Sequence, residues 1–223
     1  GEQAYHAQYQ QLAVPAEGGI WKRPWWRYWV PPFHDLAGKP DENGRPILTL
    51  PRRFDLRLHT WDLSFKKTAT GSYVCGMAWG KWKTQGFLLG MYHARASFTE
   101  TIDAVRELLA KHPAPAVYVE GKANGPAVID VLRLEIPGLI ESDVEQSKEA
   151  RAQAASPHVQ AGNFILPHPS LFPWVNTILT QCQLFPNAQH DDIVDTITQA
   201  DRFLFITQPF SSKRFVQGSD HGI

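Results

Sequence analysis

The chain has 223 residues, of which 43% are hydrophobic, and its 22 Lys and Arg residues equal its 22 Asp and Glu residues in number. This length and apolar content allow one sizeable core and indicate a single domain with an appended arm. Because the formal net charge is zero, overall charge does not indicate a nucleic-acid partner. Such a partner would have to meet a local basic surface.

Two further features limit the class of protein. Cys75 and Cys182 lack the spacing of metal ligands and are expected to be buried free thiols in a reducing compartment. No apolar run approaches the roughly 20 residues of a membrane-spanning helix, and no signal peptide opens the chain. The sequence therefore predicts a soluble intracellular protein without a membrane partner.

Residues 1–50 are predicted to form a linker or arm rather than part of the core. Within them, residues 21–29 contain four tryptophans and three basic residues. Interleaved aromatic and cationic side chains are typical of a platform for single-stranded nucleic acid. The alternative, which we favour, is an arm whose large apolar rings hold it against the surface of the domain.

Residues 51–208 are predicted to form the domain, followed by a flexible tail over residues 209–223. Period-two patterns and short turns predict an antiparallel meander of three strands at 56–66, 72–80 and 86–95. A helix over 97–111 follows, with Ser97 and Glu100 as a capping box. The later expected elements are a strand at 116–120, a helix at 126–135, a strand-like piece at 139–144, a helix at 147–155, a strand at 163–166, and helices at 170–185 and 191–205.

This order of elements predicts an α/β fold. A meander followed by alternating helices and strands builds a mixed sheet flanked by helices. It is the layout of the ribonuclease H-like fold, in which the strands at 56–66 and 116–120 are neighbours.

Acidic residues occur at three positions of that layout where their side chains could converge. Asp62 lies in the middle of an apolar and aromatic strand, where an uncompensated charge costs several kcal/mol. Glu120 ends the strand at 116–120, and the pair Asp191 and Asp192 begins the last helix. If these side chains converge, their hard oxygen atoms suit Mg²⁺ or Mn²⁺. Two such ions about 3.5–4 Å apart can stabilise both oxygens of an in-line phosphoryl displacement.

Each acidic residue also has a structural explanation. Asp62 can pair with Lys66, and Glu120 can be the first exposed residue after a buried strand. A helix start favours Asp191 and Asp192 through capping and the macrodipole.

Two neighbouring residues are further candidates with less specific roles. Asp195, one turn on from the aspartate pair, is either an auxiliary ligand or a surface charge, which we favour. His190 either orients water or a carboxylate at the cleft or forms a local hydrogen bond.

Basic residues close to these points are candidates for binding DNA phosphates. They follow Asp62 and Glu120 directly, lie in the turn between the second and third strands, or share one helix face. The candidates are Lys66, Lys81, Lys83, Lys122, Lys148 and Arg151. Individually, each also fits an ordinary solvated charge.

Together these pieces resemble the nuclease domain of the large terminase subunit of tailed double-stranded DNA bacteriophages. The resemblance covers about residues 50–205, and residues 4–35 are similar to the linker that follows the packaging ATPase in such proteins. The motifs that carry it are Thr60-Trp61-Asp62-Leu63-Ser64-Phe65-Lys66, Val117-Tyr118-Val119-Glu120-Gly121-Lys122-Ala123-Asn124-Gly125, Lys148-Glu149-Ala150-Arg151, and Phe185-Pro186 leading to His190-Asp191-Asp192-Ile193-Val194-Asp195.

The resemblance implies a metal-dependent endonuclease of the host cytoplasm that cuts concatemeric viral double-stranded DNA when genome packaging starts and ends. It implies Mg²⁺ or Mn²⁺, as two ions, held by Asp62, Glu120 and the Asp191/Asp192 pair, with Asp192 favoured. The implied partners are DNA, an ATPase domain, the portal and the small terminase subunit. Members often carry another acidic residue where this chain has Gly71-Ser72 ahead of Tyr73, which puts a fourth ligand and tight binding of the second ion in doubt.

Other readings remain open at the level of sequence. The chain contains no Gly-x-x-x-x-Gly-Lys-Ser/Thr loop, so it is expected to cut DNA but not to translocate it. One alternative is a non-catalytic DNA-binding or docking module that uses residues 21–29. Another is a resolvase-like or transposase-like nuclease of the same fold acting on branched or transposon-end DNA.

Overall fold

The computed structural model describes residues 19–63, 72–121, 125–143 and 145–207. The elements are β1 (Arg27–Val30), β2 (Leu48–Thr49), β3 (Leu56–Asp62), β4 (Ser72–Trp82), β5 (Gln85–Ala96), α2 (Phe98–Lys111), β6 (Ala116–Glu120), α3 (Gly125–Leu132), β7 (Leu139–Ser142), α4 (Lys148–Gln160), β8 (Phe164–Pro167), α5 (Val175–Leu184) and α6 (Asp192–Asp201). A short 3₁₀ helix at Arg23–Trp25 precedes β1, and a π-helix at Arg202–Ile206 continues α6.

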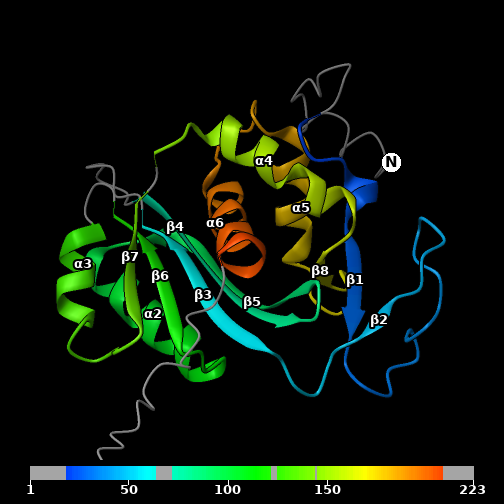
Figure 1. Cartoon of the computed structure of the whole chain (residues 1–223), viewed down its shortest axis with the longest axis horizontal. Helices are drawn as coiled ribbons and strands as arrows, with labels where there is room; N and C mark the ends of the chain where they lie inside the picture. Colours follow the sequence, from blue (N-terminus) through cyan, green and yellow to red (C-terminus); the bar gives the residue numbers. More distant parts are fainter. Residues whose placement is uncertain (1–18, 64–71, 122–124, 144, 208–223) are drawn as a thin grey trace, which may run out of the picture.

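The strands form one mixed sheet in the order β2-β1-β8-β5-β4-β3-β6-β7. β3, β4 and β5 pair antiparallel as the expected meander. β6 adds to β3 in parallel and β7 adds to β6 in parallel, which gives the sheet its mixed character. The α/β, ribonuclease H-like fold predicted from the sequence is therefore confirmed, including the neighbouring positions of β3 and β6 (Figure 1).

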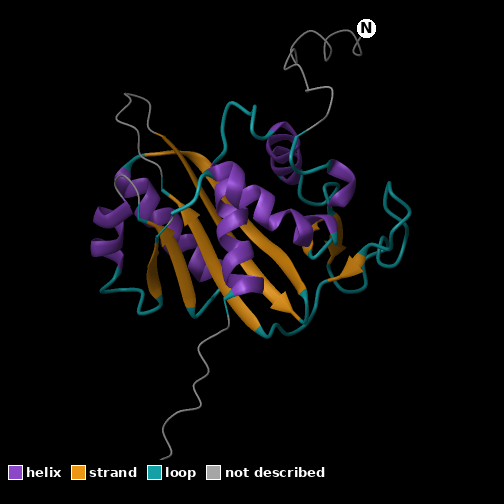
Figure 2. Cartoon of the chain, turned by 45° about the horizontal axis from the view of Figure 1, so that its top comes forward, coloured by secondary structure: helices purple, strands orange, loops and turns teal. Residues whose placement is uncertain are grey.

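Helices cover both faces of the sheet and define two cores (Figures 1 and 2). On one face, α4, α5 and α6 pack over a cluster that includes Leu58, Met77 and Trp79. On the other face, α2 and α3 pack over a cluster that includes Trp61 and Val119. Side chains of β3 alternate between these two cores, because successive residues of a strand point to opposite faces.

The tryptophan-rich segment is part of the sheet. β1 pairs in parallel with β2 on one side and β8 on the other, so the sheet includes residues on both sides of position 50. Trp21, Trp26 and Trp29 are each at most 4% exposed. The indole N–H of Trp21 donates to the Ala152 carbonyl and that of Trp29 donates to the Leu88 carbonyl. These three rings are not available to stack against bases, so the single-stranded platform hypothesis is wrong for them.

Several local expectations are confirmed and others need correction. The capping box of Ser97 and Glu100 is present at the start of α2, and both cysteines are free and buried. β3 ends at Asp62, so this carboxylate lies at the end of its strand and not in its middle. α5 begins at Val175 and not at residue 170, because Pro173 restricts the residue before it and lacks an N–H donor.

Two predicted segments lie outside the described residues: the tail at 209–223 and the amino-terminal part of the arm at 1–18. Within the part of the chain that the structure describes, no helix is long and apolar enough to cross a membrane.

Close packing fixes the backbone next to Asp62. Trp61 and Gly76 are cross-strand partners in the β3–β4 ladder, and the Trp61 side chain is fully buried. A Cβ atom at position 76 would lie 2.3 Å from a ring carbon of Trp61. Only glycine leaves room for the ring at this position, so Gly76 lets Trp61 anchor the end of β3.

His59 is a buried neutral histidine on the α2 side of β3. Its Nε2 atom lies 2.8 Å from the carbonyl oxygen of His112, and its Nδ1 atom has no hydrogen-bond partner among the described groups. Because a carbonyl oxygen only accepts, Nε2 carries the proton of the neutral ring. Burial lowers the pKa of His59 to about 4.

This lowered pKa predicts a loss of stability at acid pH. The unfolded chain binds a proton at His59 near the ordinary pKa of 6.5, whereas the folded chain does so only near 4. The free energy of unfolding is therefore not reduced by His59 above pH 6.5. As the pH drops toward 4, protonation of this residue in the unfolded chain lowers the free energy of unfolding by about 2–3 kcal/mol. His59→Gln keeps a donor for the His112 carbonyl but does not titrate. Urea unfolding at pH 7 and pH 4.5 should show a smaller pH effect in the variant, and equal effects would contradict the assignment.

Candidate functional site

The carboxylates of Asp62 and Glu120 lie at the ends of adjacent parallel strands. Trp61 of β3 is paired with Val119 of β6, so Asp62 and Glu120 each come one residue later on neighbouring strands. Trp61 and Val119 belong to the core under α2 and α3. Because side chains alternate, Asp62 and Glu120 face α6. They are only 4% and 6% exposed, so Glu120 is not the exposed residue that its structural explanation required, whereas Lys66, the suggested partner of Asp62, lies outside the described residues.

A row of polar side chains crosses four strands at this level. Asp62 is paired with Cys75 of β4, and Cys75 is paired with His93 of β5. The row therefore runs Glu120, Asp62, Cys75, His93. Burial raises the pKa of the Cys75 thiol, and the negative charges of Asp192 and then Asp62 raise it further. Both aspartates are thus close enough to influence the same buried thiol.

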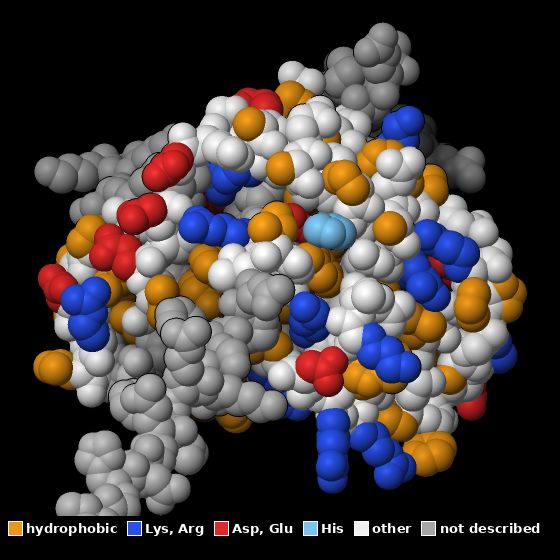
Figure 3. Space-filling view, in the orientation of Figure 1, with side chains coloured by type: hydrophobic (Ala, Val, Ile, Leu, Met, Phe, Trp, Pro, Cys, Tyr) orange, Lys and Arg blue, Asp and Glu red, His pale blue; other side chains and the backbone are white. Residues whose placement is uncertain are grey.

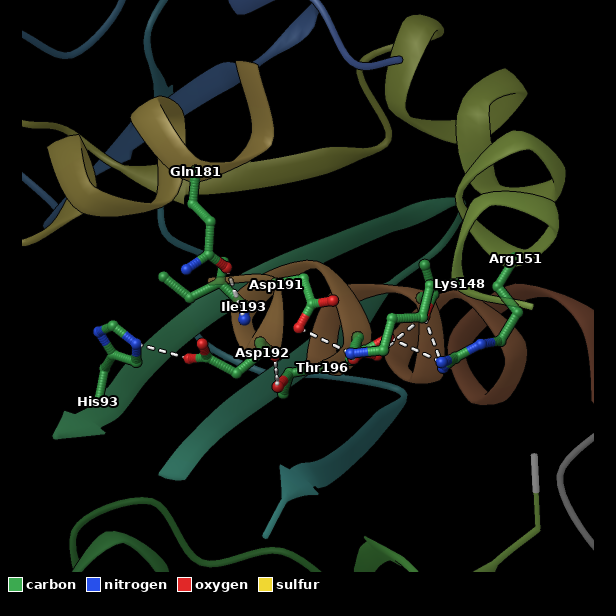
Figure 4. Close-up of polar contacts among 10 residues, drawn as sticks. His93, Lys148, Arg151, Gln181, Asp191, Asp192, Ile193 and Thr196 are labelled. Carbon is green, nitrogen blue, oxygen red and sulfur yellow. Dashed lines mark hydrogen bonds and ion pairs between the residues drawn. The ribbon is translucent and has the colours of Figure 1, made fainter. Parts of the chain in front are cut away.

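Asp192 reaches this row from the first turn of α6. Its Oδ2 atom lies 2.6 Å from Nε2 of His93 (Figure 4). Neither atom forms a hydrogen bond with any other described group, although both are buried. Asp192 is 5% exposed. The α6 end of the site is therefore held against β5 through this contact.

The start of α6 is capped by another helix and not by its own aspartates. The Ile193 N–H donates to Oε1 of Gln181 in α5 at 2.8 Å. Asp191 occupies the N-cap position, but its side chain makes no capping hydrogen bond. The capping explanation for Asp191 is therefore wrong in the described structure, and Gln181 performs that role (Figure 4).

Asp191 and Asp192 point in opposite directions. Asp192 points toward His93, whereas Asp191 points toward Lys148 at the start of α4 (Figure 4). The ammonium of Lys148 lies 2.7 Å from Asp191 and 2.5 Å from Asp195. Burial lowers the pKa of Lys148, but its hydrogen bonds to Asp191 and Asp195 outweigh burial and raise it. This lysine therefore stays charged between the two carboxylates.

Asp195 is a buried ion-pair partner and not a surface charge. Its side chain is 3% exposed, and Arg151 donates to its Oδ1 atom from 2.7 Å. A second guanidinium nitrogen of Arg151 donates to the Thr198 hydroxyl. We call the four side chains of Lys148, Arg151, Asp191 and Asp195 the α4–α6 clamp. The clamp fixes the first turns of α6 on the side opposite His93.

His93 is the residue that sequence reasoning missed. Its ring stacks on Tyr73 at 5.0 Å between centroids, and the same tyrosine contacts His190 at 4.4 Å. The Arg95 guanidinium lies 4.9 Å from the Tyr73 ring. Tyr73 thus contacts the rings of both His93 and His190. No sequence spacing links His93 to Asp192; only the pairing of β5 with β4 brings the two together.

The predicted DNA-contacting residues fall into three groups. Lys66 and Lys122 lie outside the described residues. Lys81 and Lys83 are at the far end of β4, since Lys81 is paired with Leu56 whereas Cys75 is paired with Asp62. Six residues of strand span about 20 Å, so these two lysines do not flank the carboxylates. The third group, Lys148 and Arg151, is close to the site but forms the α4–α6 clamp.

The carboxylate oxygens of Asp62, Glu120 and Asp192 are hard donors, which suit a divalent ion. Among the residues that the structure describes, no group of three or more His, Cys, Asp or Glu side chains is arranged to hold a metal ion. Asp62, Glu120 and Asp192 are nevertheless all buried on the α6 side of one end of the sheet, and buried carboxylates need a compensating charge. Oδ2 of Asp192 lies 2.6 Å from Nε2 of His93, and a carboxylate oxygen is a hard donor of the kind that Mg²⁺ takes.

Comparison with known proteins gives a family and a set of similar folds. The family model for the terminase RNaseH-like domain matches residues 59–200. A search of curated protein sequences gave no match.

Three solved structures illustrate the likeness in fold. The large terminase of one thermophilic bacteriophage superposes with a TM-score of 0.56 at 13% identity, covering 84% of this chain and 45% of that chain. The large terminase nuclease of a second thermophilic phage, G20c, gives 0.53 at 12% identity, covering 81% and 96%. The human cytomegalovirus terminase nuclease domain gives 0.50 at 16% identity, covering 67% and 85%. The chain thus spans less than half of the first of these proteins.

The α4–α6 clamp predicts a large loss of stability when one cation is removed. Arg151 is 13% exposed on its side chain, and Arg151→Met leaves the buried Asp195 with Lys148 alone. We expect the free energy of unfolding to fall by about 2–4 kcal/mol. The matched control is Arg106→Met, which removes an exposed arginine from pairs with Asp103 and Glu135 and should change stability little. Equal effects in denaturant unfolding would show that the clamp does not stabilise α6.

Proposed function

The chain belongs to the terminase RNase H-like domain family, and we propose that it is the DNA-cutting part of a large terminase. In this proposal it is a divalent-metal-dependent endonuclease that cleaves concatemeric viral double-stranded DNA when packaging begins and ends. The observation that supports it most is the placement of two buried carboxylates, Asp62 and Glu120, at the ends of neighbouring parallel strands that face α6.

Asp62, Glu120 and Asp192 would hold Mg²⁺ or Mn²⁺, as two ions. Bound ions of this kind lower the pKa of a coordinated water and stabilise charge on a phosphate that is being attacked. We favour Asp192 over Asp191 because Asp191 is already paired with Lys148 and points away from the row of polar side chains. His93 would keep the Asp192 carboxylate turned toward the sheet.

A second feature of these carboxylates is that regular secondary structure holds them in place. Asp62 and Glu120 lie between the sheet and α6 at the sheet's end, where strand backbones fix the position of each Cα atom. Rigid elements hold reacting groups more accurately than loops do. The carboxylates would therefore hold the ions that contact a phosphate of the DNA backbone without a large rearrangement of the strands.

The alternative functions are less well supported. A docking module that uses the tryptophan-rich segment would need exposed rings, but Trp21, Trp26 and Trp29 are buried. A resolvase-like or transposase-like nuclease would share the fold but not the family to which this chain belongs. The ATPase domain, the portal, the small terminase subunit and the host cytoplasm remain proposals for the longer protein.

Replacing the β3 carboxylate tests the proposed chemistry. Asp62→Asn keeps the size of the side chain but removes its charge, so cleavage of supercoiled plasmid in Mn²⁺ should fall at least about 100-fold. Asp103→Asn, which changes an exposed aspartate on α2, should cut at the original rate. EDTA should abolish cutting by the unchanged chain. The proposal fails if Asp62→Asn remains folded, as judged by its melting temperature, and still nicks DNA at full speed.

A second comparison separates the two aspartates at the start of α6. Asp192→Asn should lower both cleavage and Mn²⁺ affinity far more than Asp191→Asn, because only Asp192 faces the sheet. Calorimetric titration with Mn²⁺ measures the affinity without relying on activity. Equal losses in both variants would contradict the assignment of Asp192 as the ligand.

A further inference from the structure

A cavity of about 420 Å³ opens beside the proposed cutting site, between α4, α6 and the segment after β7. Two of its lining residues connect it to the carboxylates. Ser142 of β7 is paired with Glu120, and the side-chain oxygen of Gln199 accepts the N–H of Trp61, the neighbour of Asp62. Neighbouring strands are about 4.8 Å apart, so the cavity begins about one strand spacing from Glu120.

The lining of this cavity offers groups of both kinds. The N–H donors on its lining belong to Arg151, Gln199 and Arg202, and the carboxylate acceptors to Asp143, Glu145 and Asp201. Figure 3 shows basic and acidic side chains gathered together on the upper left of this face, over the region of α4, α6 and β7. A bare phosphate, whose oxygen atoms only accept, would meet these carboxylates unfavourably. A nucleobase presents donors and acceptors along the same edge and matches this mixed lining.

We propose that this cavity receives one nucleobase of the DNA strand that is cut, turned out of the duplex next to the scissile bond. The proposal rests on the proposed endonuclease function and adds a subsite to it. A volume of about 420 Å³ is within the range of small-ligand sites. Turning a base out of the stack costs a few kcal/mol and costs least where the base is already unpaired. DNA with an unpaired nucleotide should therefore bind more tightly.

The test fills the cavity from a position where a larger side chain does not disturb the core. Ala154 is exposed on α4 and lines the cavity, whereas Gln153 is exposed on the same helix and does not line it. Ala154→Trp fills the cavity, and Gln153→Trp is the matched control. Both changes are made in the Asp62→Asn chain, so that the DNA stays intact, and their melting temperatures are compared.

Binding is measured by fluorescence anisotropy with two duplexes that differ by one extrahelical thymidine. We expect the chain with Ala154 to bind the bulged duplex about tenfold more tightly. Ala154→Trp should abolish this preference and leave the affinity for the paired duplex within about twofold, while Gln153→Trp keeps the preference. Equal affinities for both duplexes, or a preference that survives Ala154→Trp, would overturn the subsite. Failure of the unchanged chain to cut either duplex in Mn²⁺ would instead refute the endonuclease function.

Discussion

The parallel pairing of β3 with β6 is the contact on which the rest of the site depends. The two strands are separated in sequence by β4, β5 and α2, yet their register places Asp62 and Glu120 at the same level of the sheet. A shift of one residue would turn one carboxylate to the opposite face, into the core under α2 and α3. The fully buried Trp61, seated against Gly76, fixes the end of β3 and resists such a shift.

The third carboxylate depends on a helix, α6, that is held by the sheet, by α4 and by α5. His93 contacts Asp192 from the sheet, while Lys148 and Arg151 hold Asp191 and Asp195 from α4. The cap from Gln181 fixes the first turn from α5. Three acidic side chains in the first turns of one helix would repel one another strongly without these cations. The clamp thus offsets the charges of Asp191 and Asp195, while Asp192 remains directed at the sheet.

The sequence was sufficient to predict the order of elements and the fold class, because the meander, the capping box of α2 and the apolar run of β6 each have strong local patterns. It was not sufficient for β1 and β2, which are short and lie in a Pro-rich and Trp-rich stretch without alternation. The misplaced Lys81 and Lys83 have a geometric cause, since β4 is eleven residues long and carries them to the far end of the sheet. His93 and the clamp were missed or misread because their partners are set by tertiary packing alone.

β1 lies inside the sheet, with hydrogen-bonded parallel neighbours on both sides. A mechanical load applied to the chain just ahead of Arg27 would be resisted by both of these short ladders, which pair β1 with β2 at Trp29 and Val30 and with β8 at Arg27, Tyr28 and Trp29. The buried indoles of Trp26 and Trp29 add further resistance to sliding. The segment ahead of β1 is therefore coupled to the sheet through strand pairing and buried rings, so tension applied there would pass into the sheet.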